Sequence, residues 1–196
     1  MLMSNITSQT AIDNRFVTTR ALRDGTTYNH IRRAYRNGEL IRLRHGIYSQ
    51  PEALMDIMID VESIVPSGVV CLYSAWFYHN LTTTVPPSIC IAIARKRKVV
   101  TPSILPISIY YWQNDLLNFG ITSANYSGHE VRITDAERSV CDAIKYRNKI
   151  GHDLCAEVLK SYLRRRDRNI PLLPDYAKRL RVWTTLRIYL EIALTE

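Results

Sequence analysis

The chain carries RFVTTRALRDGTTYNHIRRAYRNGELIRLRHGIY, residues 15–48, and this stretch decides the fold expected for its amino-terminal part. Its pattern predicts a helix, a turn, a second helix and a short two-stranded wing. Thr18 or Thr19 can cap the first helix, and Gly25 can end it, because glycine accepts the left-handed backbone that terminates helices. The second helix is expected over about residues 27–37.

The second helix, capped at Thr26 or Thr27, should have two different faces, because successive helical residues are turned by about 100°. The face expected to pack inward carries Tyr28, Ile31, Ala34 and Tyr35. The opposite face carries Asn29, Arg32, Arg33 and Arg36. That second face suits a DNA major groove, where arginine hydrogen-bonds guanine and asparagine hydrogen-bonds adenine.

The wing is predicted by the alternation in LIRLRHGIY, residues 40–48. Ile41 and Leu43 should face inward, and Gly46 can supply the hairpin turn. Basic side chains at the wing then lie near the phosphates of a bound duplex. The complete set of expected DNA contacts is Arg20, Thr27, Asn29, His30, Arg32, Arg33, Arg36, Arg42, Arg44 and His45. The competing interpretation is an ordinary helical hairpin whose basic face is only solvated.

Charge is concentrated in the same region of the chain. Residues 1–50 hold eight arginines and three acids, a balance of +5, whereas the other 146 residues hold 18 basic and 15 acidic groups, a balance of +3. The two balances add to the net charge of +8, which indicates an acidic partner. We therefore expect a winged helix-turn-helix DNA-binding domain over residues 1–50 and a second domain over residues 51–196.

No part of the chain resembles a membrane span or a signal peptide, so we expect a cytoplasmic protein. Its hydrophobic and charged fractions, 46% and 22%, are those of an ordinary globular protein. The cysteines are widely separated and form no C-x-x-C pair, which predicts buried free thiols rather than a zinc site or disulfides. They are Cys71, Cys90, Cys141 and Cys155.

The second domain should mix helices and strands, which makes the whole chain α+β. A further helix is expected over residues 4–14, in the first domain. Helices of the second domain are expected over residues 52–64, 74–81, 134–144, 152–166, 173–181 and 183–194. Strands are expected over residues 88–94, 107–112, 120–126 and 130–133, with Ser127-Gly128 joining the last two.

The run TDAERSVCDAI, residues 134–144, marks the return from strand to helix. Thr134 and Glu137 have the spacing of a capping box, in which each side chain bonds a free backbone N–H of the first turn. Asp135 adds negative charge at the same helix terminus. The apolar stripe of this helix should consist of Val140, Cys141 and Ile144.

We find little in the second domain that predicts catalysis. The chain has no glycine-rich phosphate loop, no paired-histidine metal spacing and no D/E-x-K triplet of a metal-dependent nuclease. The acids grouped around Arg138 are Asp135, Glu137 and Asp142, and helix capping plus an ion pair explains them. We therefore predict no catalytic residue, no metal ligand, no cofactor and no enzyme activity.

Two basic runs, Arg95–Lys98 and Arg164–Arg168, receive no role from the sequence. Either could touch nucleic acid or a phosphate of a partner. Short charged runs at the ends of strands and helices are more often a solvated surface.

Taken together, the motifs resemble the AbiEi-type antitoxin family, the regulatory half of type IV abortive-infection toxin-antitoxin operons. The resemblance covers nearly the whole length and rests on the order and spacing of several stretches. These are FVTTRALRDG, NGELIRLRHGIY, VVCLYSAWFYHNLTTTVP, ITSANYSGHEVRITDAERSVCDAI with its T-x-x-E-R-S-V-x-D core, and DYAKRLRV.

The resemblance implies a repressor that binds inverted repeats in its own operator through the winged module. It also implies an antitoxin in phage defence that opposes a nucleotidyltransferase toxin, by direct contact or functionally. The second domain would resemble a restriction-nuclease core without the nuclease residues. Two other classes stay open from the residues alone, a DNA-targeted nuclease or nucleotide-modifying enzyme and a pure protein-interaction module.

Overall fold

The computed structural model describes residues 16–18, 25–44, 46–49, 61–101, 106–126 and 129–195. The chain divides into two compact units. The described residues up to Pro66 belong to the first unit, and Ser67–Arg97, Pro106–Tyr126 and the residues from Glu130 onward form the second. Residues 50–60, around the domain boundary expected from the sequence, lie outside the described residues.

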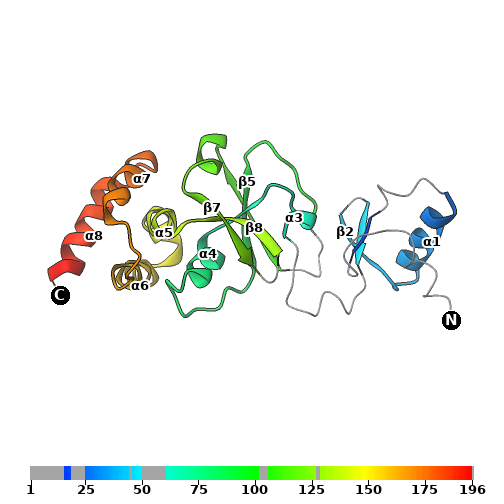
Figure 1. Ribbon diagram of the computed structural model, residues 1–196, viewed down its shortest axis with the longest axis horizontal. Helices are drawn as coiled ribbons and strands as arrows, with labels where there is room; N and C mark the ends of the chain where they lie inside the picture. The colour runs from blue at the N-terminus through cyan, green and yellow to red at the C-terminus, as the bar shows by residue number, and fades with distance from the viewer. Residues whose placement is uncertain are drawn as a thin grey trace. The chain divides into compact units, whose positions relative to one another are not determined.

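The first unit combines a three-stranded sheet with a basic helix, α1 (Figure 1). Its elements are β1 (Phe16–Thr18), α1 (Gly25–Arg36), β2 (Ile41–Arg44), β3 (Ile47–Ser49) and α3 (Val61–Ile64). Strand β3 is central and pairs antiparallel with both β1 and β2. The predicted β2–β3 hairpin is confirmed, with Gly46 at φ 82° in its turn.

The start of this unit differs from the sequence prediction. Thr18 ends strand β1 opposite Ile47 of β3. Gly25 begins α1, so Thr26 and Thr27 lie inside the first turn and are not caps. The helices expected over residues 4–14 and 19–24 lie outside the described residues.

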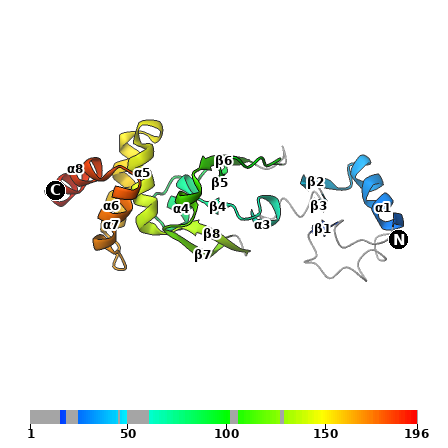
Figure 2. The same cartoon turned by 90° about the horizontal axis from the view of Figure 1, so that it is seen from above.

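The second unit is built on a five-stranded mixed sheet of order β6-β5-β4-β8-β7 (Figure 2). Strand β4 pairs antiparallel with β5 and parallel with β8, and β5 pairs parallel with β6. The strands are β4 (Val69–Val70), β5 (Ile89–Ala94), β6 (Ile107–Trp112), β7 (Ile121–Tyr126) and β8 (His129–Thr134). The mixed α/β character expected for this part of the chain is confirmed.

Helices pack beside this sheet around α5, which contacts α4, α6, α7 and α8. These helices are α4 (Leu72–Tyr78), α5 (Ala136–Ile150), α6 (His152–Leu163), α7 (Leu173–Arg179) and α8 (Trp183–Thr195). Short 3-10 turns are η2 (Asn114–Leu117) and η3 (Ile170–Leu172). The three carboxy-terminal helices and the four strands predicted in this unit are therefore confirmed to within a few residues.

A single apolar core joins these layers, and Trp76, Ile144 and Tyr162 are among its fully buried members. Burying one large apolar side chain contributes about 1.5–3 kcal/mol. The four cysteines are buried and free, as predicted. In the part of the chain that the structure describes, no helix is both long and apolar enough to cross a bilayer.

The apolar run after Pro66 divides differently from the prediction. Its first residues form strand β4, and α4 begins at Leu72 rather than at Ser74. The amide of Cys71 donates to the carbonyl of Cys90, which extends the β4–β5 pairing to the start of the helix. The side chain of Ser74 then accepts from the amide of Cys90 at 2.9 Å, so this buried hydroxyl ties α4 to β5.

Candidate nucleic-acid interface and the buried arginine network

Helix α1 is anchored by one side and exposed on the other. Ile31 is only 3% exposed, and Ala34 is half-buried. Tyr28 and Tyr35 are 47% and 44% exposed, so the prediction that both face inward is wrong. Both tyrosines border the buried stripe, and Tyr35 packs its ring edge-on against Tyr48 of β3, with ring centroids 5.8 Å apart.

The opposite side of α1 carries the predicted basic face, since Asn29, Arg32, Arg33 and Arg36 are all exposed. None of the three arginines forms an ion pair with any residue that the structure describes. Glu39, the acid that follows α1 in the sequence, accepts a hydrogen bond from the side chain of Asn37 at 3.0 Å. The positive charge of this face is therefore not neutralised within the described unit.

Part of this charge also stabilises the helix itself. Arg33 and Arg36 lie in the last turn of α1, where a cation contributes about 0.3–1 kcal/mol by interacting with the helix dipole. Arg32 lies outside that turn. Asn29 also lies outside it and is uncharged, so neither side chain contributes to this stabilisation. The structural role of the last-turn arginines therefore does not account for the whole face.

A hydrogen-bonded turn connects α1 to the β2–β3 hairpin. The amide of Gly38 donates to the carbonyl of Tyr35, and the amide of Glu39 donates to that of Ala34, which is the Schellman pattern of helix ends. Gly38 has φ 76°, a conformation that favours glycine. The turn fixes the direction in which the chain leaves α1 for β2.

The structure places the other predicted contacts as follows. His30 is exposed on α1, and Arg42 is exposed on β2, where a register shift separates it from Arg44. Thr27 lies in α1 and Arg44 in β2, but their side chains are not among those described. Arg20 and His45 lie outside the described residues. The basic face of α1 and the exposed Arg42 of β2 therefore belong to the same unit.

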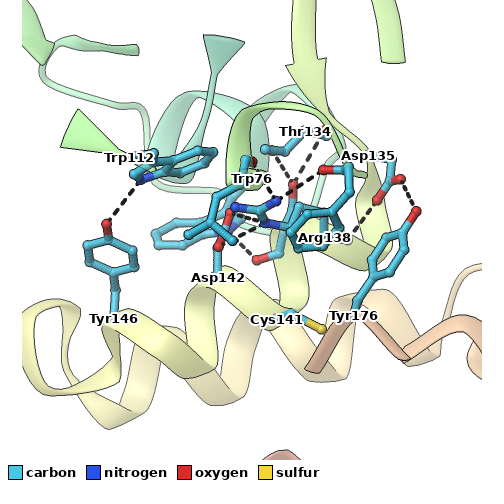
Figure 3. Close-up of polar contacts among 12 residues, drawn as sticks. Trp76, Trp112, Thr134, Asp135, Arg138, Cys141, Asp142, Tyr146 and Tyr176 are labelled. Atoms are coloured by element: carbon cyan, nitrogen blue, oxygen red, sulfur yellow. Dashed lines mark hydrogen bonds and ion pairs between the residues drawn. The ribbon is translucent and has the colours of Figure 1, made fainter. Parts of the chain in front are cut away.

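In the second unit, Glu137, Arg138 and Asp142 of the TDAERSVCD segment are buried instead, and Figure 3 shows the contacts around Arg138. Arg138 has no exposed surface, and its Nε lies 3.1 Å from both carboxylate oxygens of Asp142. Its Nη1 donates to the carbonyls of Leu116 and Phe119, each at 3.0 Å. The guanidinium also lies over the Trp112 and Phe119 rings, 4.6 and 4.2 Å from their centroids.

The helix cap at this junction is not the predicted one. Asp135 is the N-cap of α5, and its carboxylate accepts from the amide of Arg138 at 2.7 Å and from Tyr176 Oη at 3.0 Å. Thr134 ends β8, with its hydroxyl 2.8 Å from that of Ser139. The capping box is therefore wrong by one position, because Thr134 continues the strand ladder.

Glu137 likewise has a partner that its spacing could not reveal. Its carboxylate accepts from Tyr162 Oη at 2.9 Å and from the amide of Asn169 at 3.0 Å. It therefore ties α5 to the end of α6 instead of completing a capping box. The apolar stripe predicted for the same helix, with Val140 and Ile144, is confirmed as buried.

Capping by Asp135 and the ion pair of Asp142 agree with the sequence prediction, whereas Glu137 does neither. Burial raises the pKa of the Asp142 carboxyl, and the Arg138 guanidinium opposes that rise. Burial also raises the pKa of Asp135, against the effect of its bond to the Arg138 amide. Among the described residues, no group of three or more histidine, cysteine or acidic side chains could hold a metal ion.

Sequence reasoning missed Gly120 as part of this network. The amide of Asp135 donates to its carbonyl at 2.9 Å, and its φ of 60° favours glycine. A Cβ at this position would lie 2.7 Å from the Cβ of Arg138, which is too close for two carbon atoms. The glycine therefore allows the η2–β7 turn to approach the start of α5.

The two basic runs are placed differently from one another. Arg95, Lys96 and Lys98 are exposed after β5, whereas Arg165 is half-buried at the end of α6. Its Nη1 donates to the carbonyl of His79 at 2.6 Å, and its other nitrogens bond the carboxylate of Asp167. Arg165 therefore holds a turn in place and is not simply solvated.

No protein-family model matches the chain, and no curated protein matches it either. The function is therefore inferred from the exposed and buried charges of the chain itself. The charges on α1 and β2 are exposed to a ligand, whereas those around Arg138 are buried.

The buried ion pair leads to a stability prediction. Asp142→Ala leaves the Arg138 guanidinium buried without its counter-ion, so the free energy of unfolding should fall by about 3–5 kcal/mol. The matched control is Glu191→Ala, which removes the acid of another i,i+4 pair, with Arg187, whose side chains are 60% and 68% exposed. That change should cost about 0–1 kcal/mol. Equal losses for the two variants in urea unfolding would contradict the structural role of Asp142.

A second prediction concerns pH. Nε2 of His79 donates to the carbonyl of Thr134 at 2.6 Å, and burial lowers the pKa of this histidine below its ordinary 6.5. As the pH falls, the unfolded chain therefore takes up this proton before the folded chain does. The contribution of His79 to the free energy of unfolding is fully present above pH 6.5 and falls as the pH drops toward the folded-state pKa.

His79→Gln keeps an N–H donor but does not titrate. Thermal unfolding across this pH range should therefore show a smaller loss of stability in the variant than in the natural chain. An identical pH dependence of the two proteins would show that His79 does not carry the effect.

Proposed function

We propose that this protein is a double-stranded DNA-binding transcriptional regulator that reads its operator with α1. The observation that supports this proposal is the exposed face formed by Asn29, Arg32, Arg33 and Arg36, whose arginines have no ion-pair partner among the described residues. A helix that is packed through Ile31 on one side can present such a face to an anionic groove. The ligand must therefore supply negative charge and hydrogen-bond acceptors.

Duplex DNA supplies both. Its major groove admits an α-helix, and arginine can donate two hydrogen bonds to the O6 and N7 atoms of guanine. Asparagine recognises adenine in a comparable two-bond geometry. The exposed Arg42 on β2 suits a phosphate contact, which positions the protein but does not read sequence.

The proposal extends to the biological role implied by the family resemblance. In this view the first unit is a winged helix-turn-helix that binds inverted repeats and represses its own operon. The second unit is an antitoxin domain with a nuclease-like core that lacks catalytic residues, and the protein counters a nucleotidyltransferase toxin. The charge asymmetry between residues 1–50 and the remaining chain supports the assignment of DNA binding to the first unit.

The test of base recognition uses an electrophoretic mobility shift with the DNA upstream of its own gene. Arg32→Ala and Arg36→Ala should each weaken binding by roughly 1–3 kcal/mol if the side chain contacts a base. Arg187→Ala, which removes an exposed arginine from α8 of the other unit, is the matched control and should leave the affinity unchanged. Unchanged affinity in both α1 variants would sink the assignment of this face.

The wing is tested by the salt dependence of the same binding reaction. Arg44→Ala should reduce the slope of log K against log salt by about one unit, because each phosphate contact releases about one condensed counter-ion. The loss should be similar on operator and unrelated DNA, since phosphates carry no sequence information. An unaltered slope would remove Arg44 from the interface without affecting the assignment of α1.

A further inference from the structure

The sheet of the second unit has two edges of very different character. Strands β6 and β7 occupy the edges, as Figure 2 shows, with β5, β4 and β8 between them. Strand β7 exposes the polar side chains of Thr122, Ser123 and Asn125. Strand β6 has the sequence ISIYYW and exposes Tyr111 by 55%.

Backbone groups of β6 on its outer side have no strand to pair with among the described residues. The carbonyls of Pro106 and Trp112 accept from amides of Ile89 and Arg95, at 2.8 and 2.9 Å. Alternate residues of a parallel strand bond the same neighbour, so the even-numbered residues of β6 face β5. Residues 107, 109 and 111 therefore direct their N–H and C=O groups away from the sheet.

This edge also lacks the devices that normally prevent strand pairing. Natural edges are protected by charged side chains, proline or bulges. Residues 99–114 contain no charged side chain, although 22% of the chain is charged. Pro106 lies just before the strand, and the register of β6 against β5 is regular along its length. The strand can therefore accept a further strand without charge repulsion.

We propose that β6 pairs antiparallel with β6 of a second copy of this chain, around a two-fold axis at Ile109. In that register Ile109 faces its own symmetry mate, and Ile107 faces Tyr111 of the other copy. Both sets of opposed residues direct backbone groups outward, so each opposed pair exchanges two hydrogen bonds. The pairing joins the two five-stranded sheets into one continuous sheet.

The sequence of β6 is complementary to itself in this register. Pairs of β-branched and aromatic side chains, such as isoleucine opposite tyrosine, are favourable across antiparallel strands. Ile107, Ile109 and Tyr111 alternate along β6 and so point to one face of the sheet, and directly opposed residues of the two copies share that face. Each copy carries a net charge of +8, but β6 has no charged side chain, so the opposed residues of this register place no like charges directly opposite one another. The second copy is therefore the occupant that this edge fits, and the proposal does not depend on DNA binding.

The full chain without DNA provides the test, by sedimentation equilibrium over a range of concentrations. The natural protein should dimerise. Ile109→Lys and Ile109→Glu should each raise the dimer dissociation constant by roughly tenfold or more, because like charges directly opposite one another repel. Mixing the two variants should restore association, because unlike charges then face each other at the two-fold axis.

A backbone variant gives an independent measurement. Ile109→Pro removes an N–H that points away from β5, so the ladder inside the sheet stays intact while pairing with a second copy is blocked. Ser123→Lys on the exposed surface of β7 is the matched control and should leave the dimer unchanged. Circular dichroism melting of each variant confirms that the chain remains folded.

A natural chain that stays monomeric at all concentrations would overturn the proposal. So would folded Ile109→Lys and Ile109→Glu variants that dimerise normally, or a mixture of them that fails to associate better than either alone. Loss of the dimer in Ser123→Lys would assign the contact to β7 instead and would equally overturn it.

Discussion

The second unit depends on the buried ion pair between Arg138 and Asp142. Both side chains are 1% exposed, and removing either partner of such a pair leaves an uncompensated charge in a medium of low dielectric constant. The same guanidinium donates to the carbonyls of Leu116, in η2, and Phe119, just after it, and it lies over the rings of Trp112 and Phe119. One side chain therefore connects α5, the turn before β7 and the end of β6.

Neighbouring residues of the same helix extend this constraint outward. Asp135 reaches Tyr176 on α7, and Glu137 reaches Tyr162 on α6. The indole of Trp76 on α4 donates to the carbonyl of Ser139 at 2.9 Å. Three residues between 135 and 139 thus bond three different helices, α7, α6 and α4. These bonds orient the three helices around the start of α5.

Arginine has opposite roles in the two units. On α1, Arg32 and Arg36 are exposed and have no acidic partner among the described residues, so their charge is available to a ligand. In α5, Arg138 is fully enclosed and each of its contacts is internal. A planar guanidinium suits both roles, because its fixed fork of donors can bond either a carboxylate or the edge of a base. Burial alone separates the structural use from the proposed binding use.

Local periodicity in the sequence was enough to predict the strand over residues 107–112, the basic face of α1 and the helices after residue 150. The sequence also indicated that Asp135 and Asp142 act by capping and ion pairing, but it did not reveal the partners of Glu137. Tertiary contacts were needed to show that Thr18 lies in a strand, that Asp135 rather than Thr134 caps α5, and that β6 lies at the edge of the described sheet. The physical reason is distance along the chain, because strand pairing and the partners of buried charges come from segments that no local pattern connects.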